Sequence, residues 1–315
     1  MREIIATSFQ NVAPLFCVVF VGYALRRLHV LTEGDAVPLN TLCFRLLLPC
    51  LCIRSMQTVT FDAAYLRLVL YILAAYAVTI PLLWLIVPRL IRDRGQAGVV
   101  IQAAFRSNDV LLGIPLMENI CGTARMAPMM IAVAEVLLLY NFTAVVVLAH
   151  FSERQDAQAD FGNVCRKVIR NPIIIGTLIG LALRLSPVTL PVLIEKPLGS
   201  LASCASTVAM IAIGLRFRFA ALSGSRRAIG LGVSVKLLLG PLVWVTLAAL
   251  LGFRGDLLCA IFLVFACPTA TASVALADAM GCDGDLAGEL VLVSTAGSLL
   301  TIFCGVVLLR ALALI

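Results

Sequence analysis

The chain has 315 residues, of which 62% are hydrophobic and 13% are charged, and its mean hydropathy is +1.07. Soluble domains contain about 45–50% apolar and about 25% charged residues, so a water-soluble fold is excluded. The net charge of +7 comes largely from Lys and Arg in the loops between apolar runs, so it does not require a nucleic-acid partner.

Ten apolar runs approach the roughly 20 residues that a helix needs to cross a bilayer. They are apolar on every side, unlike the alternating strands of a membrane barrel. The first run lacks a cleavage-like pattern, so we interpret it as a membrane helix rather than a signal peptide. The sequence predicts an all-α polytopic membrane protein with ten transmembrane helices, at approximately residues 5–25, 36–54, 66–88, 97–120, 127–150, 169–185, 192–215, 228–251, 256–279 and 287–310.

Lys and Arg are more frequent in the loops after the odd-numbered spans than in the opposite loops. Cytoplasmic loops carry this excess in membrane proteins. We therefore expect an integral protein of the cell (inner or plasma) membrane with both termini outside.

The eleven cysteines are scattered, and the two histidines, His29 and His150, lie near span ends. No C-x-x-C pattern is present, and cysteine within an apolar run behaves as a small hydrophobic residue. We expect neither a disulfide framework nor a metal site nor a cofactor.

The chain resembles itself when it is shifted by 160 positions. Its two tryptophans, Trp84 and Trp244, then coincide, as do the prolines three residues before each. Each half has five spans, and this odd number makes the second half enter the membrane from the opposite face. We predict two inverted five-helix repeats, residues 1–155 and 169–315, joined by a linker at 156–168. The alternative is a chance alignment of apolar sequences.

The fourth span, "AFRSNDVLLGIPLMEN" from residue 104, is interrupted by polar side chains. They occupy four consecutive positions: Arg106, Ser107, Asn108 and Asp109. A charge at the bilayer centre costs at least ~2.5–3.5 kcal/mol, so it is rarely without a function. Gly113 and Pro115 follow as candidate hinges, although on their own they would indicate only a kink between packed helices.

The ninth span, "ACPTATASVALADAMG", contains Pro268, Thr269 and Thr271 at the matching depth. If both spans break there, the freed helix N-termini meet near the midplane and form a site for an anion. The predicted substrate-binding residues are Arg106, Ser107, Asn108, Asp109, Pro268, Thr269 and Thr271, with Gly113, Pro115 and Pro268 as crossover hinges.

Glu135 lies in the middle of the fifth span. Because low dielectric disfavours the charged form of a carboxyl group, Glu135 and Asp109 are candidate carriers of a coupling proton. The alternative for Glu135 is a structural pairing with Arg106 or Arg45. Lys236, in the eighth span, could attract substrate or pair with an acid.

Four stretches carry a resemblance to a known family: "FRSNDVLLGIPL", "IAIGLRF", "SVKLLLGPL" and "ACPTATASVALADAMGCDGDLAGELVLVSTAGSLLTI". On these, the chain resembles the auxin efflux carrier family of membrane transporters, including bacterial malonate-type carriers and, more distantly, the plant PIN-formed carriers. The likeness covers nearly the whole chain.

The resemblance implies ten helices in two inverted repeats, with the fourth and ninth helices unwound where they cross. The first, second, sixth and seventh helices would form a scaffold, often dimeric, and the others a mobile transport domain. Asn108 and Pro268 match the family's crossover residues. Ser107 stands where plant members have a proline, so we expect a gentler unwinding of the fourth helix there.

Two classes of function remain open for the carrier itself. The first is alternating-access transport of a small organic anion such as a carboxylate, coupled to H⁺. The second is a sodium-coupled symporter of the related bile-acid type, in which Asn108, Glu135 and Thr295 would hold Na⁺. An intramembrane aspartyl protease is disfavoured, because the "GCDGDL" stretch has Cys282 where that motif requires glycine.

Overall fold

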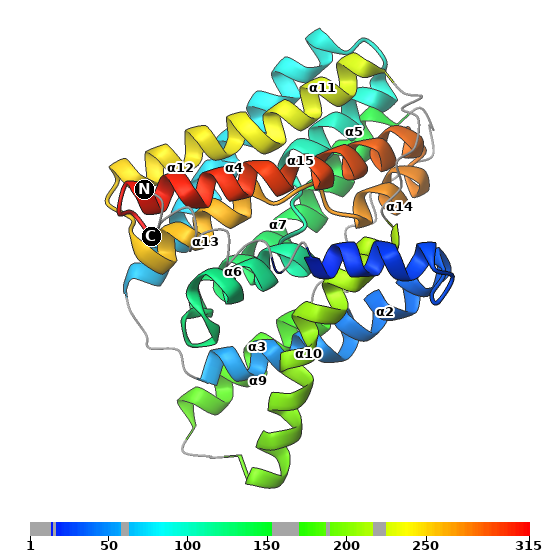
Figure 1. The fold of residues 1–315 in the computed structure, drawn as a ribbon. Coiled ribbons are helices and arrows are strands. Elements are labelled where there is room, and N and C mark those ends of the chain that lie inside the picture. The colour runs from blue at the N-terminus through cyan, green and yellow to red at the C-terminus, as the bar shows by residue number, and fades with distance from the viewer. Residues whose placement is uncertain (1–13, 15–16, 58–62, 153–169, 187–189, 217–224) are drawn as a thin grey trace.

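The computed structural model describes residues 14, 17–57, 63–152, 170–186, 190–216 and 225–315. Apart from turns and one isolated β-bridge, these residues form helices (Figure 1). Residues 17–27 are helical. The α-helices after them are α2 (Ala36–Leu42), α3 (Leu48–Gln57), α4 (Ala63–Leu90), α5 (Arg94–Phe105), α6 (Ile114–Cys121), α7 (Ala127–Phe151), α9 (Pro172–Leu185), α10 (Val192–Arg216), α11 (Arg226–Ser234), α12 (Gly240–Leu250), α13 (Gly255–Ala266), α14 (Ala272–Ala279) and α15 (Gly284–Ala311).

Short 3₁₀ and π segments connect several of these helices. The 3₁₀ turns are η1 (Glu33–Asp35) and η4 (Thr123–Arg125). The π segments are η2 (Cys43–Leu47), η3 (Asp109–Gly113) and η5 (Val235–Leu239). Because η2 and η5 continue into the helices on both sides, α2 to α3 and α11 to α12 each form one long helix with a local irregularity.

Six helical runs within the described residues are long and apolar enough to cross a membrane. They are Glu33–Gln57, Ala63–Leu90, Ala127–Phe151, Val192–Leu215, Arg226–Leu250 and Gly284–Ala311. Two shorter apolar helices are Pro172–Leu185 and Gly255–Ala266. The prediction of an all-helical polytopic membrane protein is confirmed. The first expected span lies mostly outside the described residues, as does the linker at 156–168.

Polar residues at helix N-termini define where several helices begin. The side chains of Asp93, Asn171, Ser225 and Asp283 accept hydrogen bonds from backbone N–H groups in the first turn of α5, α9, α11 and α15. Such caps satisfy N–H groups that have no partner inside the helix. The helix boundaries therefore follow from local sequence chemistry.

The helices form two packed groups (Figure 1). The first group contains α2, α3, α9 and α10, with α3 in contact with both α9 and α10. Residues 17–27 join this group, because a Cβ atom on Gly214 of α10 would lie only 2.0 Å from the Val19 carbonyl oxygen. The second group contains α4 to α7, with η3, and α11 to α15. We call them the small group and the large group.

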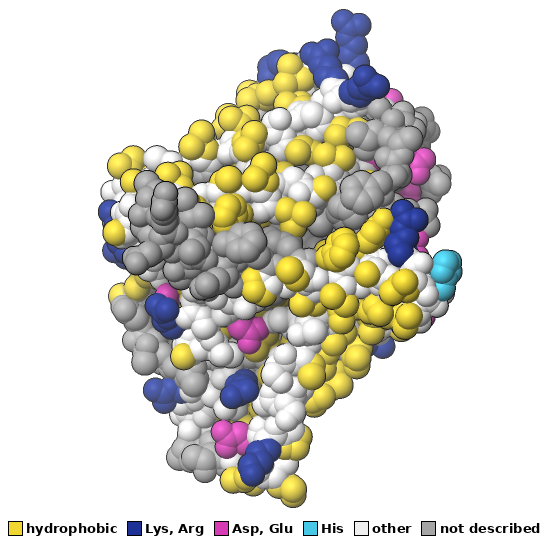
Figure 2. All heavy atoms as spheres, viewed as in Figure 1, with side chains coloured by type: hydrophobic (Ala, Val, Ile, Leu, Met, Phe, Trp, Pro, Cys, Tyr) yellow, Lys and Arg dark blue, Asp and Glu magenta, His cyan; other side chains and the backbone are white. Residues whose placement is uncertain are grey.

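The main core lies in the large group, around α5 and α13. Nearly every residue of these two helices is buried, which explains why α13 is apolar on all sides from Leu257 onward. The outer face in Figure 2 has hydrophobic side chains across its middle, and Lys and Arg gather mainly along its edges. Apolar groups therefore occur both inside and outside, as a surrounding bilayer requires.

The fourth and ninth spans are each split in two, and the breaks pair with each other. Between α5 and η3 the chain is non-helical at residues 106–108, and between α13 and α14 at residues 267–271. Ser107 and Thr269 form an antiparallel bridge. The Asn108 N–H donates to the Pro268 carbonyl oxygen at 2.7 Å, and the Ala270 N–H donates to the Arg106 carbonyl oxygen at 3.0 Å.

At Ser107 the helix is interrupted over residues 106–108, although no proline stands there. The bridge bonds give partners to the Asn108 N–H and the Arg106 carbonyl oxygen, which lie outside the helices. Pro115 does not interrupt the chain. It is the second residue of α6, which continues directly from η3.

Candidate functional site

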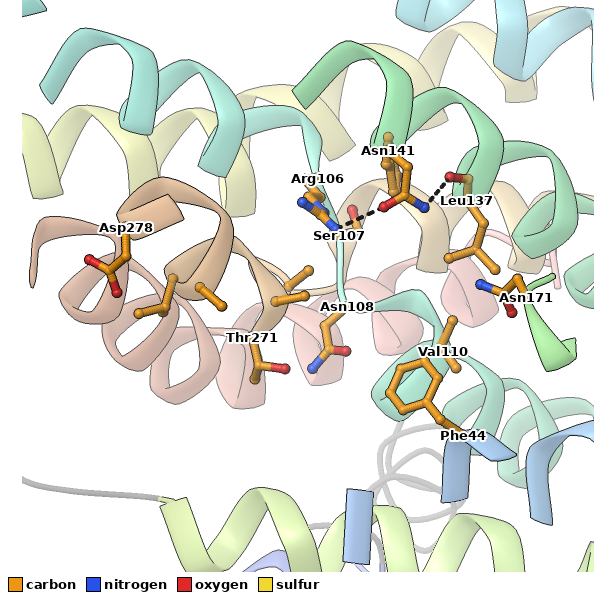
Figure 3. A pocket seen from close by; sticks show the side chains of 15 residues that line it. Phe44, Arg106, Ser107, Asn108, Val110, Leu137, Asn141, Asn171, Thr271 and Asp278 are labelled. Atoms are coloured by element: carbon orange, nitrogen blue, oxygen red, sulfur yellow. Dashed lines mark hydrogen bonds between the residues drawn. The ribbon is translucent and has the colours of Figure 1, made fainter. Parts of the chain in front are cut away.

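A cavity of about 500 Å³ opens beside the crossing of the two breaks (Figure 3). Both groups of helices contribute to its wall: Phe44 and Asn171 come from the small group, and the other residues from the large group. Its lining is Phe44, Arg106, Ser107, Asn108, Val110, Leu137, Tyr140, Asn141, Asn171, Ala270, Thr271, Ala272, Val274, Ala275 and Asp278. The site thus combines a polar centre with an apolar wall.

Arg106 supplies the positive charge of this cavity. It follows the last residue of α5 in an extended conformation, and only 8% of it is exposed. Its Nη2 donates to the Asn141 side-chain oxygen at 3.2 Å, and Asn141 is itself fixed by donating to the Leu137 carbonyl oxygen at 2.7 Å. Figure 3 shows the Arg106 and Asn141 side chains next to each other in the cavity wall, with a dashed line for this hydrogen bond.

The Arg106 charge has no acidic partner in the described part of the chain. No Asp or Glu oxygen of these residues lies within 4.0 Å of the guanidinium, and its buried Nη1 has no hydrogen-bond partner. A buried charge is costly unless it is paired. The geometry therefore favours an anionic ligand beside Arg106.

Asn108 and Thr271 add neutral polar groups from the two breaks. Asn108 is buried, and its side chain points to the same side of the crossover as that of Thr271 (Figure 3). Thr271 precedes α14, whose first residue, Ala272, also lines the cavity. The start of α14 consequently borders the same space as Arg106.

The hydroxyls of Ser107 and Thr269 hold the crossover together rather than facing a ligand. The Ser107 hydroxyl donates to the Val264 carbonyl oxygen of α13 at 2.6 Å. The Thr269 hydroxyl donates to the Ala103 carbonyl oxygen of α5 at 3.1 Å. Each break thus satisfies an unpaired carbonyl at the end of the other helix. Neither Thr269 nor Pro268 lines the cavity.

A buried polar cluster lies behind the crossover. Asp109 is 2% exposed, does not line the cavity, and accepts a hydrogen bond from the Tyr140 hydroxyl at 3.1 Å. The Lys236 ammonium, also 2% exposed, donates to the Ser107 hydroxyl oxygen. Asp109 and Lys236 are not within ion-pair distance of each other. The alternative in which Lys236 attracts substrate directly is disfavoured, because Lys236 does not line the cavity.

Glu135 and Thr295 lie away from the cavity wall. The Glu135 carboxyl faces α4 near Leu73 and makes no ion pair with Arg106 or Arg45, so the structural pairing considered for it is not observed. The Thr295 hydroxyl donates to the Val291 carbonyl oxygen of its own helix at 2.6 Å. Asn108, by contrast, lines the cavity.

Gly113 is the last residue of η3, the segment that follows the first break, and it is closely packed. A Cβ atom there would lie 2.6 Å from the Met129 methyl carbon and 3.3 Å from the Cys267 sulfur. The glycine therefore allows η3 to approach both α7 and the second break. Among the described residues, no group of three His, Cys, Asp or Glu side chains is arranged to hold a metal ion.

Sequence reasoning missed the cavity residues that come from intact helices. Tyr140 and Asn141 stand together in the apolar stretch "EVLLLYNF", and adjacent polar groups in a membrane span were a usable signal. Asn171 precedes a proline at a helix start, and Phe44 lies in an ordinary apolar stretch. These two carried no comparable signal, because only the packing of the small group against the large group brings them to the cavity.

Comparison with known proteins identifies a family and several relatives, including the two that follow. A family model described as membrane transport protein matches residues 7–304. An uncharacterized transporter of Methanothermobacter thermautotrophicus is 26% identical over 300 residues, which cover 94% of this chain and 96% of that protein. The lysosomal cholesterol signaling protein of Mus musculus is 25% identical over 224 residues, which cover 67% of this chain but 26% of that protein.

Proposed function

Because the chain belongs to the membrane transport protein family, that of the auxin efflux carriers, over nearly its whole length, we propose that it carries a small organic anion across the cell membrane by alternating access. The family consists of transporters, not enzymes. The observation that carries the proposal is the buried Arg106 guanidinium, which lines the cavity without an acidic partner in the described residues. Asn108, Thr271 and the start of α14 supplement it as substrate contacts.

The composition of the cavity wall suggests a class of anion. Arg106 is the one cationic side chain among the lining residues, which favours a single carboxylate over a dicarboxylate. Phe44, Val110, Leu137 and Val274 provide an apolar surface for the rest of the molecule. We therefore propose a monocarboxylate with an apolar body as substrate.

Alternating access would move the large group against the small group. Support comes from the cavity itself, whose wall is shared by Phe44 and Asn171 of the small group and Arg106 of the large group. The order of helices before and after the linker at 156–168, each with a broken helix before its last long helix, supports two inverted repeats. Both termini outside the membrane and a homodimer through the small group complete the proposal.

Proton coupling is assigned to Asp109 in this proposal, with Glu135 as the second candidate. Asp109 adjoins the crossover and shares a hydrogen bond with Tyr140, a residue of the cavity wall, whereas Glu135 faces α4. Protonation of Asp109 would leave the Lys236 charge uncompensated and so favour an anion in the cavity. The buried Lys236 ammonium would repel a Na⁺ ion near Asp109. Sodium coupling is therefore the second choice, after proton coupling.

The proposal is tested by ligand-dependent thermal stability of the purified protein between pH 5 and pH 8. Phenylacetate, malonate and acetate are compared on wild type and on Asn108→Ala, with Asn40→Ala as a matched control outside the cavity. We expect phenylacetate to stabilise wild type and the control but not Asn108→Ala. Equal stabilisation of all three proteins would exclude the crossover as the site. Stabilisation that requires Na⁺ rather than low pH would favour the sodium-coupled alternative.

A further inference from the structure

Tyr140 connects the buried Asp109 carboxyl with the cavity, and Tyr76 lies beside it. The Tyr140 hydroxyl donates to Asp109 Oδ2 at 3.1 Å and lies 2.6 Å from the Tyr76 hydroxyl. Tyr140 also lines the cavity, whereas Asp109 and Tyr76 do not. We propose that Tyr140 is the positioning residue that transmits the protonation state of Asp109 to the bound anion, with Tyr76 holding its hydroxyl in place. This inference rests on the proposed anion site and on Asp109 as the proton acceptor.

Aromatic packing fixes the two hydroxyls. The rings of Tyr76, on α4, and Tyr140, on α7, meet edge to face with centroids 5.5 Å apart. Phe265 of α13 stacks on Tyr76 at 5.0 Å, and Phe105 of α5 lies 6.1 Å from Tyr140. Tyr76 is 1% and Tyr140 is 2% exposed, so neither hydroxyl is free to exchange its partners with bulk water. The two hydroxyls therefore change hydrogen-bond direction more readily than position.

The number of protons on the Tyr76, Tyr140 and Asp109 side chains decides whether protonation of Asp109 strengthens or weakens anion binding. Each hydroxyl has one proton to donate. When Asp109 is ionised it accepts the Tyr140 proton, and Tyr140 can in turn accept the Tyr76 proton. When Asp109 is protonated it donates its own O–H to the Tyr140 oxygen, and the Tyr140 proton becomes available to an anion in the cavity. The anion thus gains a donor only in the protonated state.

Other groups that face Asp109 are already engaged or are poor donors. Lys236, from η5, donates to Ser107 and supplies a fixed charge. Cys267, at the end of α13, is fully buried and contributes only a weak thiol donor. Arg106, from the end of α5, is held by Asn141 on the cavity side. Tyr140, in contrast to these three, both donates a hydrogen bond to Asp109 and lines the cavity.

The test measures the affinity for phenylmethanesulfonate, an anion that stays ionised between pH 5 and pH 8, so only the protein titrates. For wild type we expect the Kd to fall about 10-fold from pH 8 to pH 5, within the range of typical coupling between sites. Tyr140→Phe should reduce this ratio about 3-fold or more, because it removes the hydroxyl that the anion gains as a donor when Asp109 is protonated. Tyr71→Phe is the matched control, because the Tyr71 hydroxyl donates instead to the Trp244 carbonyl oxygen.

Asp109→Asn separates this inference from the proposed function. Its amide mimics the protonated acid, so we expect a pH-independent affinity close to that of wild type at pH 5. A pH dependence that survives in Asp109→Asn would contradict Asp109 as the proton acceptor. A flat Asp109→Asn together with an unchanged ratio in Tyr140→Phe would overturn the role of Tyr140 alone. If Tyr140→Phe does not fold, Tyr76→Phe must show a smaller reduction of the ratio, and an unchanged ratio there would overturn the relay.

Discussion

The two helix breaks share a backbone arrangement but differ in side-chain chemistry. In both, a short extended segment forms one side of the Ser107–Thr269 bridge, and its hydroxyl closes the end of the opposite helix. The first break contains the Arg106 charge and is followed directly by Asp109. The second break, at residues 267–271, contains only neutral residues.

This difference suggests a division of labour between the two breaks. Here the charges of the first break are supported from the second half of the chain, where Lys236 donates to Ser107. The second break provides backbone support and a neutral contact, Thr271.

Arg106→Gln should produce the largest effect and tests which break binds the anion. Charge-assisted hydrogen bonds contribute about 1.5–3 kcal/mol, so we expect phenylacetate to bind about 10- to 100-fold more weakly. Isothermal titration measures this loss. Arg125→Gln is the control, since its side chain is 61% exposed and pairs with Asp256 at 3.2 Å away from the cavity. Comparable losses in both variants would mean that Arg106 acts through general electrostatics.

Ser107→Ala and Thr269→Val compare the two reciprocal hydroxyl bonds. Thr269→Val removes one neutral bond to Ala103 and should lower the free energy of unfolding by about 1 kcal/mol. Ser107→Ala removes the matching bond to Val264 and also the acceptor of the buried Lys236 ammonium. We expect a loss of about 2–3 kcal/mol for it. Denaturant titration in detergent gives both values, and a larger loss for Thr269→Val would contradict the asymmetry.

Thr271→Val should weaken phenylacetate binding less than Arg106→Gln, by about 2- to 5-fold, since it removes one hydroxyl donor but no charge. The same titration used for Arg106→Gln measures it. Thr301→Val, on α15 and outside the cavity wall, serves as the matched control. A loss as large as that of Arg106→Gln would place the main binding group in the second break instead of the first.

Glu135→Gln should have the smallest effect on coupling, because its carboxyl faces α4 rather than the crossover. We expect the ratio of phenylmethanesulfonate Kd values at pH 8 and pH 5 to stay within about 2-fold of the wild-type ratio, because Glu135 is not coupled to the anion site. The comparison is with Asp109→Asn under identical conditions. Loss of the pH dependence in Glu135→Gln would assign the proton to Glu135.

The sequence predicted the elements that depend on local chemistry. Polar residues and proline in apolar spans located both breaks, and Arg106, Asn108 and Thr271 lie together in one cavity as a crossing requires. The sequence could not decide which polar groups face the ligand. Ser107 and Asn108 are neighbours, yet the hydroxyl of Ser107 caps α13 while the Asn108 side chain points to the cavity side.

The remaining part of the site depends on packing between distant segments. Tyr140 and Tyr76 meet because α4 and α7 lie side by side, and their rings are held by Phe105 and Phe265 at the ends of α5 and α13. Asn171 reaches the cavity only where the two groups of helices meet. Periodicity and composition do not specify such contacts, since aromatic and aliphatic residues satisfy the same apolar pattern.

The most direct test of the central claim is the position of a bound anion. We would determine the structure of the wild-type protein with 4-bromophenylacetate and locate the bromine by its anomalous scattering. The account predicts bromine in the cavity beside Phe44 and Val110, with the carboxylate on Arg106 and Asn108. Bromine outside this cavity, or a carboxylate held by the second break without contact to Arg106, would contradict it.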